Sequence, residues 1–370
     1  MRSRGSVEPR LPLRTPSAAA GGDEPARFRR LAQRINAQRG GRYGPRSPAL
    51  RPTVAGTIND VAAGPPRVLV IGDLVLDVVL TATTEIRSGT DVPGRVQIRQ
   101  GGSAANTARW LARLGVRTQL VCAVGRDGAG RSLVEQLKRD DVVVRASRVA
   151  GQRTGRIGVL VVPSGERSFV ADRRAADWLR PEDLQGDWFE GVDLVHIPAY
   201  SLLGEPLGQA GRRAIELARV NGALVSVDLA SIGPLLAGGR RAARKLVASV
   251  HPDVLFATER EAEGLLGRPA TDTASEHSEL VILKRGGRGA TVIAHSGEGP
   301  PLRFDVATPA VLTADTTGAG DAFDAGFLAR WLGAPEALRL KADTLHRATL
   351  AGHRAAARHL SGPRQELPAG

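Results

Sequence analysis

The sequence predicts an α/β protein in which a mostly parallel sheet is covered by helices on both faces. Short apolar, β-branched runs recur along residues 67–286, and segments with helical spacing separate them. One part breaks this rhythm: residues 154–173 (TGRIGVLVVPSGERSFVADR) contain two strand-like runs around a Pro-Ser-Gly-Glu turn, with no helix between them. We therefore expect a small antiparallel flap beside the main sheet.

The first element of the main sheet is predicted at residues 67–80 (RVLVIGDLVLDVVL), an apolar run expected to form one buried strand. The flap is expected to combine 154–173 with residues 78–84 and 94–100. Further strands are predicted at 118–125, 193–199, 223–229, 253–258 and 280–286. Helices are predicted at 107–115, with Gly115 as its stop residue, and at 130–140, 209–221 and 240–250.

Residues 1–66 differ in composition from the rest of the chain. They hold 12 arginines against 4 acidic residues, and so carry +8 of the formal net charge of +13. The segment is rich in Arg, Pro, Gly and Ala without a regular hydrophobic period, which predicts a mostly disordered extension. Three interpretations stay open: an arm touching an anionic surface, a targeting segment, or translated sequence upstream of the true start. Because most of the basic excess lies here, a nucleic-acid partner for residues 67–370 is not favoured.

Composition excludes several other classes of protein. Hydrophobic residues make up 42% of the 370-residue chain, enough for a sizeable globular core. The single cysteine, Cys122, excludes intramolecular disulfides and cysteine-based metal clusters. No apolar stretch approaches the ~20 residues of a membrane span. We therefore expect a soluble, cytoplasmic protein with no membrane partner.

Residues 315–328 (DTTGAGDAFDAGFL) place glycines and charged residues where a helix begins. Backbone N–H groups at a helix N-terminus attract anions, phosphate above all, and glycine lets a phosphate approach the backbone closely. Asp321 has a structural explanation, since an acidic residue in a first turn favours the helix dipole. A carboxylate beside an anion site also suits a base that takes a proton from an attacking hydroxyl.

This stretch resembles the C-terminal signature of the ribokinase-like (PfkB-type) carbohydrate kinases, and residues 101–115 (GGSAANTARWLARLG) are similar to their N-terminal signature. Further blocks occur in the same order, and the resemblance covers roughly residues 67–361. It implies a three-layer α/β/α sandwich as one kinase domain at 67–370, with a lid at about 78–100 and 154–173. It also implies ATP, Mg²⁺ and in many members K⁺ as cofactors, and a homodimer through the lid is one option.

The resemblance also implies roles for individual residues. Asp321 matches the general base, and the amides of Gly318, Ala319 and Gly320 match the anion hole. The matching sugar-binding positions are Asp77, Gly101, Gly102, Ser103 and Asn106. The matching nucleotide-binding positions are Lys284, Gly286, Gly287 and Gly289. The matching metal positions are Glu261, for Mg²⁺ through water, and Asp315 with the backbone of Thr317, for a monovalent cation.

Structural alternatives remain for several of these residues. Asn106 would serve equally as a helix N-cap, Asp77 as a strand-ending residue and Asp315 as a turn residue. Thr258 replaces the asparagine of the family's Asn-x-x-Glu motif, which weakens the metal prediction for Glu261. The segment 196–203 (HIPAYSLL) lacks the acidic residue of ribokinases and offers His196 and Tyr200 instead. These departures argue against strict ribose specificity.

The leading hypothesis is an ATP-dependent kinase acting on a primary hydroxyl of a sugar, sugar acid or nucleoside. A sugar- or nucleotide-sensing protein with weak catalysis on the same fold is the alternative, and Thr258 is its best support. Nucleic-acid binding through the basic extension is the third hypothesis.

Overall fold

The computed structural model describes residues 64–164, 166–267, 278–295, 299–309, 311, 315–363 and 366–367. The predicted disordered extension, residues 1–66, lies outside the described residues except for 64–66. Within the described part of the chain, no helix combines the length and apolar character that crossing a membrane requires.

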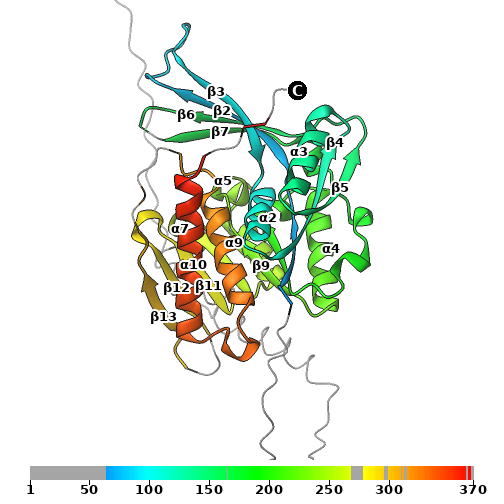
Figure 1. The fold of residues 1–370 in the computed structure, drawn as a ribbon, viewed down its shortest axis with the longest axis vertical. Helices are drawn as coiled ribbons and strands as arrows, with labels where there is room; N and C mark the ends of the chain where they lie inside the picture. The colour runs from blue at the N-terminus through cyan, green and yellow to red at the C-terminus, as the bar shows by residue number, and fades with distance from the viewer. Residues whose placement is uncertain are drawn as a thin grey trace, which may run out of the picture. The chain divides into compact units, whose positions relative to one another are not determined.

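The main sheet has nine strands in the order β13-β12-β11-β10-β9-β8-β1-β4-β5 (Figure 1). All neighbours from β11 to β5 run parallel, whereas β12 is antiparallel to both β11 and β13. The sheet is therefore mostly parallel, as predicted. Its strands are β1 (Arg67–Ile71), β4 (Arg117–Gly125), β5 (Val143–Val149), β8 (Leu194–Pro198), β9 (Leu224–Asp228), β10 (Val254–Thr258), β11 (Leu280–Lys284), β12 (Ala290–Ala294) and β13 (Leu302–Val306).

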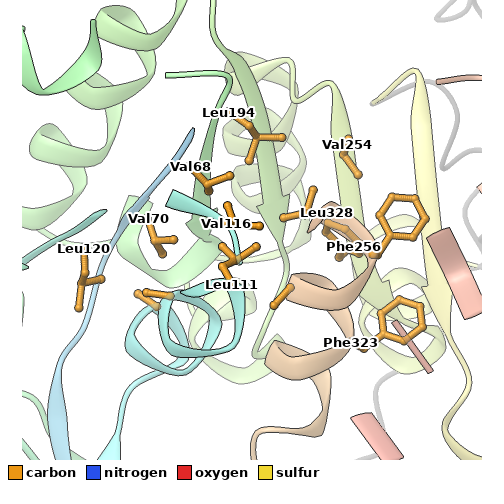
Figure 2. Close-up of a cluster of buried hydrophobic side chains, with 14 of the residues drawn as sticks. Val68, Val70, Leu111, Val116, Leu120, Leu194, Val254, Phe256, Phe323 and Leu328 are labelled. Carbon is orange, nitrogen blue, oxygen red and sulfur yellow. The ribbon is translucent and has the colours of Figure 1, made fainter. Parts of the chain in front are cut away.

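Helices cover both faces of this sheet. The side chains of β1 alternate between the two cores, Leu69 and Ile71 facing one and Val68 and Val70 the other. Helices α4, α5, α6 and α7 line the first core, and α2, α3, α9 and α10 line the second, part of which Figure 2 shows. Their bounds are α2 (Ser103–Arg113), α3 (Gly128–Arg139), α4 (Leu207–Val220), α5 (Ile232–Leu236), α6 (Arg240–Val250), α7 (Glu259–Leu266), α9 (Ala319–Leu332) and α10 (Ala342–Ser361).

A second sheet of four strands, the lid, has the order β3-β2-β6-β7 (Figure 1). The predicted hairpin at 154–173 is confirmed, since β6 (Arg156–Val161) pairs antiparallel with β7 (Arg167–Asp172). β2 (Val75–Ala82) pairs antiparallel with β3 (Gly94–Gly101) but parallel with β6, so the lid is mixed rather than wholly antiparallel. Near the end of the chain, the amide of Leu367 donates to the carbonyl of Ile98 at 2.9 Å, and Glu366 forms an ion pair with Arg95.

The prediction of one strand at 67–80 is wrong. The run divides into β1 in the main sheet and β2 in the lid, and Gly72, Asp73 and Leu74 join them. The backbone at Gly72 passes so close to α2 and the segment after β8 that an added Cβ would lie 2.8 Å from Ala104 Cβ and 2.7 Å from Ser201 Oγ. An apolar run cannot show by its pattern that the chain changes sheets, but the Gly-Asp pair inside it marks the place.

Helix α2 begins at Ser103, four residues earlier than predicted, with Gly102 as its N-cap residue. This excludes the interpretation of Asn106 as the N-cap, because Asn106 lies within the helix. The predicted stop residue Gly115 has φ of 83° and donates its amide to the carbonyl of Ala112 at 2.9 Å.

Candidate active site

The order of the strands predicts a ligand-binding crevice at the carboxyl end of β1. From β1 the sheet grows through β4 to β5 on one side and through β8 to β11 on the other. Ligands of open α/β sheets bind at such a switch point, outside the carboxyl ends of the strands. The chain leaves β1 there into the lid, and the lid strands bring further side chains over the same edge.

Asp321 lies in the first turn of α9 and faces α2. Ser103 Oγ donates to its Oδ1 at 2.7 Å, and Asn106 Nδ2 donates to its Oδ2 at 2.9 Å. Burial raises the pKa of Asp321 to about 7, although these two hydrogen bonds act in the opposite direction. A carboxylate with this proton affinity, held from both oxygens, has the properties of a general base near neutral pH. The structure thus brings the predicted site residue Asp321 together with two others, Ser103 and Asn106, which lie more than 200 positions earlier in the chain.

The turn before α9 supplies backbone donors. Gly318 is the N-cap residue, with φ of 78° and ψ of 0°, a conformation that glycine adopts without strain. In the described part of the chain, neither the Gly318 nor the Gly320 amide has a hydrogen-bond acceptor. The Ala319 amide donates to the carbonyl of Thr316 at 3.2 Å, so this member of the predicted anion hole is engaged within its own turn.

Lys284 ends β11 and lies beside Gly320, since a Cβ added to that glycine would be 3.4 Å from Lys284 Nζ. Its ammonium is 3.0 Å from Asp228 Oδ1 and 3.1 Å from Asp324 Oδ2. Burial alone would lower the pKa of Lys284, but the two carboxylates outweigh it and raise the pKa. The group is therefore a fixed cation at the helix terminus, bound to two carboxylates. Asp228 and Asp324 were not predicted as site residues. The only signal in the sequence was an acidic residue within a mostly apolar strand or helix, β9 for Asp228 and α9 for Asp324.

Asp77 lies on β2, directly opposite Arg99 of β3. Its carboxylate rests against Gly101, where an added Cβ would be 1.9 Å from Asp77 Oδ1. Burial, followed by the charges of Asp73 and Asp321, raises the pKa of Asp77 to about 7. The predicted sugar-binding residues Asp77 and Gly101 are thus in contact, and Asp77 is close enough to Asp321 for the two charges to interact.

Asp73 was missed by the sequence analysis. It follows β1 and is only 3% exposed. Its Oδ1 accepts from Tyr200 Oη at 2.6 Å and from the Ala104 amide at 3.2 Å, and Arg173 Nη1 is 3.4 Å from its Oδ2. A polar residue two positions after the first strand was the available signal, because such positions lie at the edge where ligands bind.

The structure also shows the surroundings of Gly102, Tyr200 and His196. A Cβ on Gly102 would lie 2.4 Å from the Asp73 carbonyl oxygen, so the backbone approach requires glycine. Tyr200 is linked to the site by its hydrogen bond to Asp73. His196 is fully buried with its Nδ1 2.9 Å from Ser226 Oγ, and burial lowers its pKa to about 4. It is a core residue rather than a sugar ligand.

Glu261 forms a capping box with Thr258 at the start of α7. Its Oε2 accepts from the Thr258 amide at 2.7 Å, and Thr258 Oγ1 accepts from the Glu261 amide at 3.3 Å. Thr258 therefore serves as the N-cap residue of α7. Among the described residues, no group of three or more His, Cys, Asp or Glu side chains is arranged to hold a metal. Mg²⁺ on a nucleotide does not need such a group, because phosphates and water supply most of its ligands.

The predicted nucleotide-binding glycines form the tight connection between β11 and β12. Gly286 and Gly287 are exposed, and a Cβ added to either would meet no atom within 4 Å. Gly289 is different: it is buried, has φ of 91°, and a Cβ there would be 2.1 Å from the Val306 carbonyl oxygen. Two of these glycines thus leave space at the surface, and the third is required by close backbone packing.

The predicted monovalent-cation position contains protein donors instead. Asp315 Oδ2 accepts from Arg99 Nη1 at 3.0 Å, and its Oδ1 accepts from the Thr317 amide at 3.0 Å. Arg167 Nη1 donates to Thr317 Oγ1 at 2.9 Å, and His359 Nε2 is 2.7 Å from the Thr317 carbonyl oxygen. A cation at this place would face two guanidinium groups, so the residues present do not fit K⁺.

A family model and individual relatives of this chain both indicate carbohydrate kinases. The family described as pfkB family carbohydrate kinase matches residues 65–361. A probable fructokinase-4 of Arabidopsis thaliana is 31% identical over 270 residues, which cover 70% of this chain and 80% of that protein.

Two solved structures illustrate the shared fold. The adenosine kinase from Sinorhizobium meliloti has a TM-score of 0.70 at 23% identity, covering 82% of this chain and 98% of its own. An uncharacterised sugar kinase from Pyrococcus horikoshii, solved in complex with ATP, has a TM-score of 0.67 at 25% identity, covering 80% and 93%. The family matches nearly all of the described residues, and residues of both signature segments meet at Asp321, so the chain belongs to the pfkB family of carbohydrate kinases.

Proposed function

We propose that this carbohydrate kinase transfers the γ-phosphoryl group of ATP to a primary hydroxyl of its acceptor, with Asp321 as general base. The proposal rests on one observation: the Asp321 carboxylate and the backbone N–H donors lie together at the N-terminus of α9. Asp321 is fixed by Ser103 and Asn106 at the same helix terminus where the Gly318 and Gly320 amides have no acceptor among the described residues. One helix end thus offers a base for the hydroxyl and donors for the phosphoryl group.

The proposed reaction moves one proton and one phosphoryl group. The acceptor lies against Asp77 and Asn106, between the lid and α2. Its hydroxyl gives its proton to Asp321 as the oxygen forms a bond to the γ-phosphorus. The bond from that phosphorus to the β,γ-bridging oxygen breaks, and ADP leaves. Closure of the lid over the acceptor excludes water, which would otherwise compete as a phosphoryl acceptor.

Negative charge on the transferred group is balanced by fixed groups of the protein. The Gly318 and Gly320 amides and the N-terminal end of α9 face developing charge without needing to reorganise. The Lys284 ammonium lies beside Gly320 as a further N–H donor, and Asp228 and Asp324, which hold it, offset its charge. In this proposal Lys284 acts on the phosphoryl site, and the open loop at Gly286 and Gly287 receives the nucleotide.

Mg²⁺ bound to ATP would neutralise the β- and γ-phosphates and orient them. Glu261 is the protein residue proposed to act through metal-bound water. Its side chain is only partly engaged by the capping box, since the hydrogen bond from Thr258 goes to Oε2. Burial is the main reason that its pKa is raised, followed by the charge of Asp228.

The relatives named as fructokinases make fructose the first acceptor to test. The experiment is a coupled ADP-release assay with ATP, Mg²⁺ and fructose, ribose, 2-keto-3-deoxygluconate, pseudouridine or adenosine. We expect one acceptor class to give saturable turnover that Asp321→Asn removes. Tight acceptor binding without ADP release for any of them would instead support the sensor hypothesis. A cytoplasmic location stays a prediction.

The lid is the proposed dimer interface. Directly paired residues of adjacent strands share a face, so the pairs Val78–Ile98 and Leu80–Val96 place four apolar side chains together. On this face Val96 is 65% exposed and Ile98 47% exposed. A second copy of the chain would cover this apolar surface. We expect sedimentation to show a dimer that Ile98→Asp converts to monomers, and Val220→Asp, an exposed control on α4, to leave it intact.

A further inference from the structure

His359, in the last turn of α10, contacts the turn that precedes α9. Its Nε2 is 2.7 Å from the Thr317 carbonyl oxygen, and its Nδ1 is 3.1 Å from Trp110 Nε1 of α2. The two rings meet edge to face, with centroids 5.7 Å apart. Trp110 is one helical turn beyond Asn106, which binds Asp321, so α2 supports the site at two points. His359 was not among the predicted site residues, because no motif in the sequence includes it.

The partners of His359 determine which of its nitrogens carries the proton. An indole N–H is only a donor, so the Nδ1 that it contacts must be an acceptor. In the neutral ring the proton then resides on Nε2, which donates to the Thr317 carbonyl. Trp110 thereby fixes the tautomer of the ring, and the ring fixes the direction of the carbonyl.

The orientation of that carbonyl sets the direction of the next amide. In a trans peptide the C=O of Thr317 and the N–H of Gly318 point in opposite directions in one plane, and among the described residues Glu205–Pro206 is the only cis bond. Because His359 draws the carbonyl toward α10, the Gly318 N–H is directed away from α10. We propose that His359 is a positioning residue that holds this amide in the anion hole, an inference that rests on the proposed function of Gly318.

Through the same contacts, His359 and Arg99 occupy the position predicted for a monovalent cation. A cation would bind the Thr317 carbonyl and the Asp315 carboxylate; here His359 donates to the carbonyl and Arg99 to the carboxylate. Gly318 leaves room for the ring, since its added Cβ would be 3.0 Å from His359 Nε2. These protein donors hold the turn permanently, so catalysis does not depend on K⁺.

Steady-state kinetics of four proteins test this inference: the full-length wild type, His359→Leu, His359→Gln and Trp110→Phe. Each is measured with the acceptor found by the ADP-release assay, in buffers with K⁺, Na⁺ or only tetramethylammonium. Loss of an oriented donor of this kind costs about 100–1000-fold in kcat, and partial misorientation should cost about 10–100-fold. We expect the about 10–100-fold loss of kcat in His359→Leu, with little change in the acceptor KM. In His359→Gln the side-chain amide nitrogen replaces Nε2, so kcat should stay near the wild-type value. Trp110→Phe should fall between them.

Three outcomes would overturn the inference. They are a wild-type kcat in His359→Leu, equal losses in His359→Gln and His359→Leu when both melt like the wild type, and strong K⁺ activation of the wild type. The ¹⁵N spectrum of labelled histidine provides a readout independent of turnover, with the His359→Gln spectrum as assignment control. An Nδ1-protonated ring at position 359 would contradict the inference even in an active enzyme. Absence of turnover in the wild type with every acceptor would contradict the proposed function instead.

Discussion

The two carboxylates of the crevice, Asp321 and Asp77, differ in how the protein holds them. For both, burial raises the pKa to about 7. Asp321 receives hydrogen bonds from Ser103 and Asn106 of α2, whereas no described residue donates one to Asp77. One carboxylate belongs to the main body and has a fixed direction, and the other belongs to the lid and retains its acceptor capacity. The difference suits a base that must be preoriented and a binding group whose partners come from the acceptor.

The largest expected effect is the loss of the base. Asp321→Asn keeps the shape of the side chain but cannot take a proton, and general-base catalysis contributes about 100–10,000-fold. We expect kcat to fall by that amount while the acceptor KM changes little. Initial rates of ADP release measure it, with Asp343→Asn, an exposed position on α10, as the matched control. A turnover number within a few-fold of wild type would remove Asp321 from the mechanism.

The second-largest effect is expected at Asp77, the carboxylate of the lid. Asp77→Asn should raise the acceptor KM by about 10–100-fold, the size expected when a hydrogen bond to a charged group is lost. The turnover number at saturation should fall much less than in Asp321→Asn. Titration of acceptor concentration for both variants separates the two roles. If Asp77→Asn lowers kcat and leaves KM unchanged, the two carboxylates have been assigned in the wrong order.

The pH profile tests both groups together. A general base acts when ionised, so kcat/KM should rise with pH through about 7 and then level off. The two carboxyls interact, so the profile reports apparent values of the pair rather than of either residue. Asp77→Asn removes one negative neighbour and should shift the remaining limb to lower pH. An unchanged limb would show that the two groups are not coupled.

The smallest effect concerns stability. A carboxyl with a folded-state pKa near 7 and an unfolded value near 3.8 binds its proton more tightly in the folded state. The folded state is therefore destabilised as pH rises from about 4 to 7, and the cost is complete above 7. Asp321→Asn escapes this cost and should be about 1–3 kcal/mol more stable than wild type at pH 8. Urea unfolding should show the advantage shrinking toward pH 4, and an advantage that does not depend on pH would contradict this origin.

The sequence predicted the main architecture because its signals are local or carried by dense motifs. The strands and helices from 118 to 286 follow apolar periodicity, and the GGSAAN and GAGD segments identified the residues that meet at Asp321. It failed at 67–80, since periodicity does not report which sheet a strand joins. It also missed Asp73 and His359, whose roles depend on contacts with Tyr200 and Thr317 that no sequence spacing specifies.

Lys284 shows a subtler limit. The sequence assigned it to the nucleotide phosphates, and its place beside Gly320 agrees with a role near phosphate. Its bonds to Asp228 and Asp324 could not be anticipated, because they join β9, β11 and α9 through the interior of the fold. The Lys284 ammonium is thus bound by two carboxylates.

Gly101 gives the crevice a property that no charged residue supplies. Its missing side chain is the space in which the Asp77 carboxylate lies, since even a methyl group there would collide with Oδ1. An alanine at this position would push the Asp77 carboxylate aside without changing the net charge of the enzyme. The absence of one methyl group at Gly101 therefore sets where the Asp77 charge lies relative to Asp321, and so influences both the shape of the site and its electrostatics.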